Sequence, residues 1–429
     1  MFHYAAGKGR TVTGDRTEFI GRNGTLEHPD ALLRRHLSGI TGAALDPCSA
    51  VQIPFELADG QSREVVFTLG AGCDAEEARR LIRRFNAPGA AGEALGNVRR
   101  YWKRTLDTVH VETPDNSLNV LANGWLMYQV LSSRMWGRSG YYQSGGAFGF
   151  RDQLQDAMSL VYAEPGLLRK QLLLCASRQF TEGDVQHWWH PPEGRGSRTH
   201  CSDDYLWLPL AVCRYVSCTG DKGVLDEMIP FLQGRAVNPD EESYYDLPDR
   251  SSQTASLYNH CVLAIQNGTG RGVHGLPLIG SGDWNDGMNR VGIGETDDGI
   301  KGSSVKYGES VWLAQFLTLT LKKFAAVSEL NGDIDGSEKY RAAAASLLLA
   351  VEKTAWAGDR YARAFYGDGT PLGTDETEGG CKLDILPQAF AVFSGMGSAP
   401  VSESGRRRSE IALEGMYDNL FDKKYKIFK

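Results

Sequence analysis

Long apolar runs are absent from the sequence, and none approaches the roughly 18 to 20 residues that a transmembrane helix needs. The amino terminus also lacks the basic and apolar regions of a signal peptide. We therefore expect a cytoplasmic protein, or the cytoplasmic part of an inner-membrane protein if the chain belongs to a longer polypeptide with membrane spans elsewhere.

Cysteine pairs of the CxxC type are missing as well, and the eight cysteines are scattered too thinly for a disulfide scaffold. This distribution predicts free thiols in a reducing compartment. A concentrated basic face is also absent, because the net charge of -7 is spread along the chain, which argues against nucleic acid as a partner. The cluster Arg406, Arg407 and Arg408 is an exception that we interpret as a solvated helix end.

The first part of the chain favours β-structure followed by a helical connection. Strand-like runs at 51–57 and 64–69 flank a good hairpin connection, and about four candidate strands are too few to close a sandwich. We predict that residues 1–72 form the carboxy-terminal part of a larger β-sandwich domain. Residues 73–115 are expected to form a helical linker, because residues 74–106 are mostly helical in pattern, with an interruption at 87–89 and an exposed face rich in Arg and Glu.

From residue 116 onward, amphipathic helical patterns alternate with long loops rich in glycine and tryptophan, and strand signals are few. The clearest helical segments are 116–136, 152–161, 166–180, 203–218, 252–266, 309–330 and 337–354. This organisation predicts a mainly α-helical fold, with residues 116–429 forming an α/α toroid whose loops make a pocket at one end. An α-solenoid is the structural alternative, but the sequence has no fixed-period repeat.

Four segments concentrate aromatic, glycine and acidic residues. The first, 141–156 (YYQSGGAFGFRDQLQD), combines glycines that allow close backbone approach with Arg151, Asp152 and Asp156, whose charged groups can hydrogen-bond to sugar hydroxyls. Asp152 can equally cap the following helix, while Arg151 and Asp156 can form an internal salt bridge. We favour substrate contact for Arg151 and Asp156 and leave both roles open for Asp152.

The second segment, 186–196 (QHWWHPPEGRG), pairs Trp188 and Trp189 with polar neighbours such as His190. Sugar rings stack their C–H faces on aromatic surfaces, so this pattern indicates a carbohydrate site. Packing of the aromatic rings beneath a loop is the structural alternative. His187 and His190, three residues apart, also suggest metal binding. No cysteine or carboxylate has convincing ligand spacing, however, and we expect no metal site.

The third segment, 201–208 (CSDDYLWL), places Asp203 and Asp204 at the start of an apolar helix. Acidic residues there complement the helix dipole, but a cap needs only one of them. One of the two aspartates is therefore also a candidate for a role in the pocket, and the sequence does not say which.

The fourth segment, 274–289 (HGLPLIGSGDWNDGMN), sets Asp283 and Asp286 beside Trp284 in a glycine-rich turn. An apolar wall can raise the pKa of one acid and keep it protonated near neutral pH, as a glycosidic proton donor requires. A hydrolase needs a second carboxylate to activate water, whereas a phosphorylase lets phosphate attack directly. Spacing alone does not choose between Asp283 and Asp286.

In the blocks 141–156, 186–208 and 275–289 the sequence resembles the inverting glycoside phosphorylases of glycoside hydrolase family 94, formerly glycosyltransferase family 36. This family includes cellobiose and chitobiose phosphorylases and the carboxy-terminal part of cyclic β-1,2-glucan synthase. The blocks occur in family order, the resemblance runs through most of the chain, and the forms YYQSGGAFGFRDQLQD and QHWWHPP are most similar to the glucan synthase branch.

The resemblance implies an (α/α)6 barrel behind a β-sandwich and a helical linker. It makes Asp286 the general acid, with Trp284 lining the subsite, and it assigns Arg151 and Asp156 to the sugar that receives phosphate. His190 and the two tryptophans before it would face the leaving sugar. The implied partners are a β-glucan and inorganic phosphate as co-substrate, with no metal or organic cofactor. No strand followed by a glycine-rich phosphate loop is present, so no nucleotide-sugar site is expected.

The sequence also departs from the family. Ser281 stands where cellobiose phosphorylases carry an arginine, which favours β-1,2-linked glucans over cellobiose. The family's histidine and Thr-Gly pair for phosphate have no counterpart, since the last histidine is His274. Only about four further helices follow Glu309 by pattern. We therefore expect a truncated chain with an incomplete barrel, whose exposed apolar faces favour association, for example as a homodimer.

These observations predict phosphorolysis, or reverse synthesis, of β-1,2-glucan with inversion, giving α-glucose 1-phosphate and adjusting chain length before another domain cyclises the glucan. Two alternatives remain open. One is an inverting β-glucan hydrolase in which Asp156 or Asp204 activates water, and the other is a glucan-binding module without catalytic activity.

Overall fold

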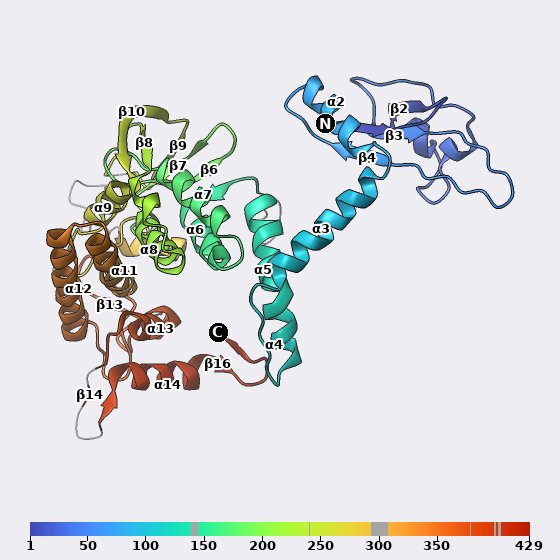
Figure 1. Ribbon diagram of the computed structural model, residues 1–429. Helices are drawn as coiled ribbons and strands as arrows, with labels where there is room; N and C mark the ends of the chain where they lie inside the picture. Colours follow the sequence, from blue (N-terminus) through green and yellow to red (C-terminus); the bar gives the residue numbers. More distant parts are fainter. Residues whose placement is uncertain (139–144, 240, 293–307, 378, 399, 402–404) are drawn as a thin grey trace. The chain divides into compact units, whose positions relative to one another are not determined.

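The computed structural model describes residues 1–138, 145–239, 241–292, 308–377, 379–398, 400–401 and 405–429. The chain divides into two compact units, Met1–Thr105 and Leu106–Lys429 (Figure 1). Among the described residues, no helix has both the length and the apolar character needed to cross a membrane.

The strands of the first unit form two separate antiparallel pairs, β1 with β4 and β2 with β3. Their bounds are β1 (Phe2–Ala5), β2 (Thr11–Asp15), β3 (Pro47–Gln52) and β4 (Phe67–Gly70). The predicted hairpin is therefore wrong. A turn does occur at Ala58, whose carbonyl accepts a hydrogen bond from Gln61 N, but β3 and β4 pair with strands from the amino terminus instead of with each other.

The helices of the first unit are α1 (Arg16–Ile20), the 3-10 helix η1 (Asp30–Leu33), α2 (Ala75–Phe85) and α3 (Ala90–Leu106). The carboxylate of Asp74 caps α2 by accepting a hydrogen bond from Glu77 N. Acidic residues in the first turn of α2 and Arg83 and Arg84 in its last turn complement the helix dipole. The helical pattern predicted for this part of the chain is confirmed, including its interruption around residue 88.

The second unit is mainly helical. Its helices are α4 (Asn116–Val120), the π-helix η2 (Leu121–Trp125), α5 (Leu126–Gln129), the π-helix η3 (Val130–Trp136), α6 (Phe150–Met158), η4 (Ser159–Val161), α7 (Pro165–Ala176), η5 (Asp204–Leu206), α8 (Trp207–Thr219), η6 (Lys222–Asp226), α9 (Leu257–Asn267), η7 (Asp286–Met288), α10 (Asn289–Gly292), α11 (Val311–Leu330), α12 (Ile334–Thr354), α13 (Ile385–Ser394) and α14 (Arg408–Leu420). The seven predicted helical segments all contain a helix. The segment predicted at 252–266 begins later than expected, because its first residues belong to a strand that ends at Ser256. The Ser256 side chain then caps α9.

One hydrophobic core joins α6, α7, α8, α9, α11 and α12. Figure 1 shows α6, α8 and α11 close together, and α11 packs along α12, α13 and α8. Trp312 and Phe316 of α11 stack with their ring centroids 5.3 Å apart. Burial of large apolar side chains at about 25 cal/mol per Å² is the main force that holds these helices together.

A four-stranded antiparallel sheet in the order β5-β6-β7-β9 lies beside these helices. The strands of the second unit are β5 (Phe148–Gly149), β6 (Gln186–His190), β7 (Arg195–Thr199), β8 (Met228–Gln233), β9 (Ser243–Asp246), β10 (Asp249–Ser256), β11 (Glu309–Ser310), β12 (Ala364–Phe365), β13 (Pro371–Leu372), β14 (Pro400–Val401), β15 (Arg406–Arg407), β16 (Phe421–Asp422) and β17 (Ile427–Phe428). Strand signals for this sheet are few in the sequence, because its strands are short and rich in polar residues.

Candidate active site

Arg151 is the centre of the site, in the first turn of α6, and its side chain is only 7% exposed. Its Nη1 donates to Asp203 Oδ1 at 2.9 Å and to the Asp283 carbonyl at 2.8 Å. Its Nη2 donates to Asp286 Oδ1 at 2.5 Å, and Asp204 Oδ1 lies 3.6 Å from Nη1. One guanidinium thus joins the first, third and fourth of the sequence segments. Residues 141–144 of the first segment lie outside the described residues.

The two aspartates that spacing could not separate have different environments. The Asp283 side chain is fully buried, and its carboxylate accepts hydrogen bonds from Arg363 Nη1 and Nη2, Ser310 Oγ and the backbone N–H of Asn285. Asp286 binds Arg151 through one oxygen, and its side chain is 63% exposed. A ligand can therefore reach the carboxyl group of Asp286, whereas that of Asp283 is used to hold the turn.

Arg363 is a residue of the site that the sequence analysis did not single out. It directly precedes β12, its side chain is 1% exposed, and both terminal nitrogens contact Asp283, at 2.6 and 2.7 Å. A second acid, Asp384, lies 3.2 Å from Arg363 Nε. A signal was present, because Arg363 is the one charged residue in the short run 361–365 and a buried charge needs partners.

Asp203 and Asp204 both belong to the site. Asp203 Oδ2 accepts a hydrogen bond from Trp207 Nε1 at 2.9 Å, and Asp204 Oδ2 lies 2.6 Å from His187 Nδ1. Burial raises the pKa of Asp203 to about 7. Burial lowers the pKa of His187, but the Asp204 carboxylate outweighs that effect and raises it to about 9, so the His187 ring is a cation at neutral pH.

A group of three potential ligands, His187, Cys201 and Asp204, has its ligand atoms within 4.8 Å of one another. Metal binding needs a neutral imidazole and a thiolate. Here the imidazole is protonated, and burial raises the pKa of the Cys201 thiol well above its ordinary range. The Arg151 guanidinium also lies 3.4 Å from Cys201 Sγ. The donor set therefore does not fit a metal ion.

The other acids of the first segment, Asp152 and Asp156, have surroundings of their own. Asp156 pairs with Arg134 at 2.6 Å, and burial raises the pKa of Asp156. Asp152 is exposed in the first turn of α6, where it complements the helix dipole without a side-chain cap hydrogen bond. Within the described residues, the carboxylates that contact Arg151 are those of Asp203, Asp204 and Asp286, and not those of Asp152 and Asp156.

Trp284 borders the Asp286 turn. Its side chain is 44% exposed, and its Nε1 donates to Gln155 Oε1 of α6 at 3.1 Å. This hydrogen bond orients the ring next to the exposed acid. The partly exposed ring keeps Trp284 a candidate for the lining of a sugar site.

The two tryptophans of β6 point to opposite faces of the sheet. Trp189 is fully buried, with its ring 5.7 Å from the Phe148 ring and 5.3 Å from the Arg178 guanidinium. The expectation that Trp189 contacts sugar is therefore corrected, because its ring has no free face. Trp188 and His190 lie on the other face, with ring centroids 5.3 Å apart, and both are partly exposed.

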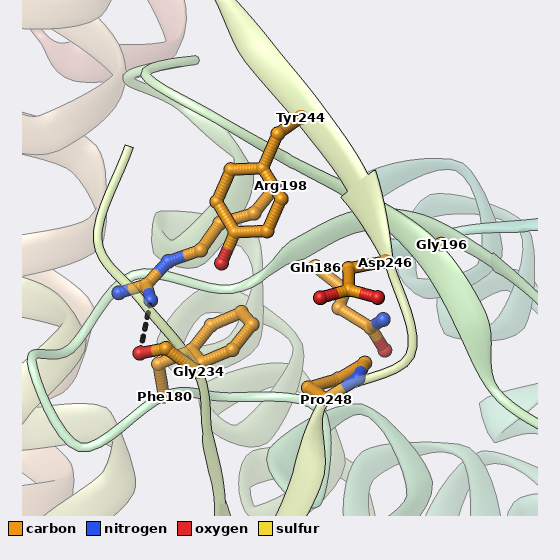
Figure 2. Close-up of a pocket in the computed structure, with 8 residues that line it drawn as sticks. All are labelled: Phe180, Gln186, Gly196, Arg198, Gly234, Tyr244, Asp246 and Pro248. Carbon is orange, nitrogen blue, oxygen red and sulfur yellow. Dashed lines mark hydrogen bonds between the residues drawn. The ribbon is translucent and has the colours of Figure 1, made fainter. Parts of the chain in front are cut away.

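A small pocket lies on the face of the sheet that carries Arg198 and Tyr244 (Figure 2). Figure 2 shows Arg198 pointing to the Gly234 carbonyl, and its guanidinium lies 3.7 Å from the centre of the Phe180 ring. Asp184 also accepts two hydrogen bonds from Arg198 at 2.6 Å. These contacts already satisfy the buried cation, so the pocket belongs to the scaffold of the sheet.

Comparison with known proteins places the chain in a class. Residues 101–428 match the catalytic domain of the glycosyl hydrolase 94 superfamily, and residues 1–88 match the glycosyl hydrolase 94 supersandwich domain. The chain belongs to this family, which confirms the resemblance seen in the sequence blocks. Its catalytic domain is of the glycosyltransferase and glycoside phosphorylase type.

The relatives include a synthase and several phosphorylases. The chain is 38% identical to cyclic beta-(1,2)-glucan synthase NdvB of Rhizobium meliloti over 97% of its own length and 14% of the synthase. It is 29% identical to 3-O-beta-D-glucopyranosyl-beta-D-glucuronide phosphorylase and 28% identical to solabiose phosphorylase, both of Paenibacillus borealis, over 89% and 90% of this chain. The chain spans 45% of each of these phosphorylases.

Proposed function

We propose that the chain cleaves, or in reverse elongates, β-1,2-glucan with inorganic phosphate, giving α-glucose 1-phosphate with inversion. The observation that carries this proposal is the exposed Asp286 carboxyl group held beside the buried Arg151 guanidinium. The β-1,2 linkage is inferred from the 38% identity to a β-1,2-glucan synthase and from Ser281. The proposed catalytic fold is an (α/α)6 barrel behind a β-sandwich.

In this mechanism Asp286 gives its proton to the glycosidic oxygen as the bond from that oxygen to the anomeric carbon breaks. A phosphate oxygen attacks the anomeric carbon from the opposite face, so a β-linkage gives an α-phosphate. The shortened glucan leaves with a free hydroxyl group that carries the proton from Asp286. Arg151 positions the acid, and Trp284 offers a ring face to the sugar.

The surroundings of Asp286 favour a phosphorylase over a hydrolase. Inverting hydrolysis needs a second carboxylate to activate water. In the described part of the chain, Asp203, Asp204 and Asp283 are at most 2% exposed in their side chains and are held by Arg151, His187 and Arg363. Asp156 is held by Arg134. Phosphate as the nucleophile removes the need for a second free acid, and we propose that no metal or organic cofactor takes part.

The test is incubation of the purified chain with β-1,2-gluco-oligosaccharides, with and without phosphate, followed by assay of α-glucose 1-phosphate and free glucose. We expect phosphate-dependent sugar phosphate that disappears in Asp286→Asn. Release of free glucose without phosphate would support the hydrolase instead. Tight binding of the glucan without either product, equal in wild type and Asp286→Asn, would support a binding module.

A further inference from the structure

A row of three residues crosses the outer face of the sheet. Trp188 in β6 lies opposite Ser197 in β7, and Ser197 lies opposite Tyr245 in β9. The rings of Trp188 and Tyr245 lean over the buried Ser197, with centroids 5.4 Å apart and an angle of 33° between their planes. Tyr245 is 50% exposed, so the pair forms a partly open aromatic surface.

Polar groups frame this surface. His190 lies against Trp188, and the Arg195 guanidinium lies 5.9 Å from the centre of the Tyr245 ring. Arg195 also pairs with Asp246 at 3.5 Å, and both side chains are well exposed. We call the residues Trp188, His190, Arg195 and Tyr245 the aromatic platform. Ring faces next to exposed hydrogen-bonding groups are the combination that a sugar ring requires.

The platform is joined to the catalytic residues on the β6 side. Trp188 follows His187, which pairs with Asp204 in the Arg151 cluster. Trp188 also lies opposite Gly149 of β5, two residues before Arg151. Both connections are short, so movement between the platform and Arg151 is restricted.

The platform is joined to the acid on the β9 side as well. Asn289, three residues after Asp286, donates its Nδ2–H to Glu242 Oε1 at 2.9 Å. Glu242 directly precedes β9, which carries Tyr245. The segment that carries Asp286 is therefore in contact with the segment that leads into the Tyr245 strand.

We propose that the aromatic platform is an outer subsite that holds glucose units of a β-glucan chain beyond the units at Asp286. This inference rests on the proposed function for the identity of the sugar. The stacked rings bind the apolar face of the sugar, and Arg195 and His190 hydrogen-bond to its hydroxyl groups. Only a chain long enough to reach from Asp286 to Tyr245 benefits from the platform.

Chain-length kinetics test the subsite. We compare phosphorolysis of the disaccharide sophorose with that of longer β-1,2-gluco-oligosaccharides in wild type and Tyr245→Ala. Loss of one stacking ring should raise KM for the longer substrates by about 10-fold, with kcat and the sophorose kinetics unchanged. Tyr425→Ala, which removes a similarly exposed tyrosine on the carboxy-terminal side of α14, serves as the matched control.

A binding measurement separates this inference from the proposed reaction. Calorimetric titration of Asp286→Asn with the longer oligosaccharides should show binding that weakens by about 10-fold when Tyr245→Ala is added. If wild type makes no sugar phosphate but this loss of affinity occurs, the proposed subsite is supported and the proposed reaction is wrong. Equal affinity with and without Tyr245, or equal effects on sophorose and on longer chains, would overturn the platform.

Discussion

The two terminal nitrogens of Arg363 contact the two carboxylate oxygens of Asp283, at 2.6 and 2.7 Å, although the residues are 80 positions apart. The Asp283 carbonyl in turn accepts a hydrogen bond from Arg151. Arg363 thereby fixes the turn that carries Asp286. It also fixes, through the Asp283 carbonyl, the Arg151 guanidinium that the Asp286 carboxyl group contacts. It is a positioning residue, since its partners are Asp283, Ser310 and Asp384 and it is buried away from any ligand.

Substitution of Arg363 should separate positioning from binding. Lysine keeps the charge but not the two parallel hydrogen bonds, so Arg363→Lys should lower kcat for phosphorolysis by about 100-fold with a smaller change in KM. Arg341→Lys, at an exposed arginine that pairs with Glu329, is the matched control. A kcat equal to that of wild type would show that the Asp283 pair does not position the acid.

Removal of the Arg363 charge should affect folding as well. Arg363→Met leaves the buried Asp283 carboxylate without its main partner, which should cost about 3 to 5 kcal/mol of unfolding free energy. Urea unfolding of Arg363→Met and of the double variant Arg363→Met/Asp283→Asn measures this cost. The double variant should recover part of the lost stability, and a double variant no more stable than the single one would contradict the argument.

The His187–Asp204 pair predicts a dependence of stability on pH. The pKa of His187 is about 9 in the folded chain and 6.5 as its ordinary value, so the stabilisation is complete below 6.5 and is lost as pH rises through 9. The shift corresponds to about 3 kcal/mol. Urea unfolding at about pH 6 and about pH 10 should show that wild type loses this much more stability than His187→Gln. Asp203, whose pKa is raised by burial, titrates in both proteins, so its contribution cancels in the comparison. Identical losses of stability in wild type and His187→Gln would contradict the predicted role of His187.

The two tryptophans of β6 should respond oppositely to substitution. Trp189→Ala empties a core position and should cost about 3 to 5 kcal/mol of unfolding free energy. Trp188→Ala removes a partly exposed ring and should cost much less, while it weakens glucan binding. Thermal unfolding of the two variants tests this difference, and a larger loss in Trp188→Ala would reverse our assignment of the two faces.

Metal removal should not change the activity. The imidazolium of His187 and the protonated thiol of Cys201 do not suit a metal ion. Dialysis against a chelator should therefore leave the rate of glucose 1-phosphate formation unchanged. Loss of activity that returns with added zinc would show that these residues become ligands after all.

Sequence patterns predicted the helices well, because apolar spacing determines which helix faces are buried. They did not predict which residues meet. The Arg363–Asp283 contact joins segments that are distant in the sequence. The spacing of Asp283 and Asp286 does not reveal that Asp283 has two buried partners, Arg363 and Ser310. The roles of Trp188 and Trp189 depend on a register shift between Gln186 and Trp188, which decides the face to which each ring points.

We propose that Asp286 is the proton donor and that Asp283 holds the turn. Phosphorolysis of β-glucosyl fluoride tests it, because fluoride leaves without protonation. For Asp286→Asn we predict a rate loss on β-1,2-gluco-oligosaccharides of about 100-fold to 10,000-fold but a near-normal rate on the fluoride. Asp283→Asn should lose activity on both substrates. Equal losses of Asp286→Asn on both substrates, or selective retention of fluoride cleavage by Asp283→Asn, would contradict the account.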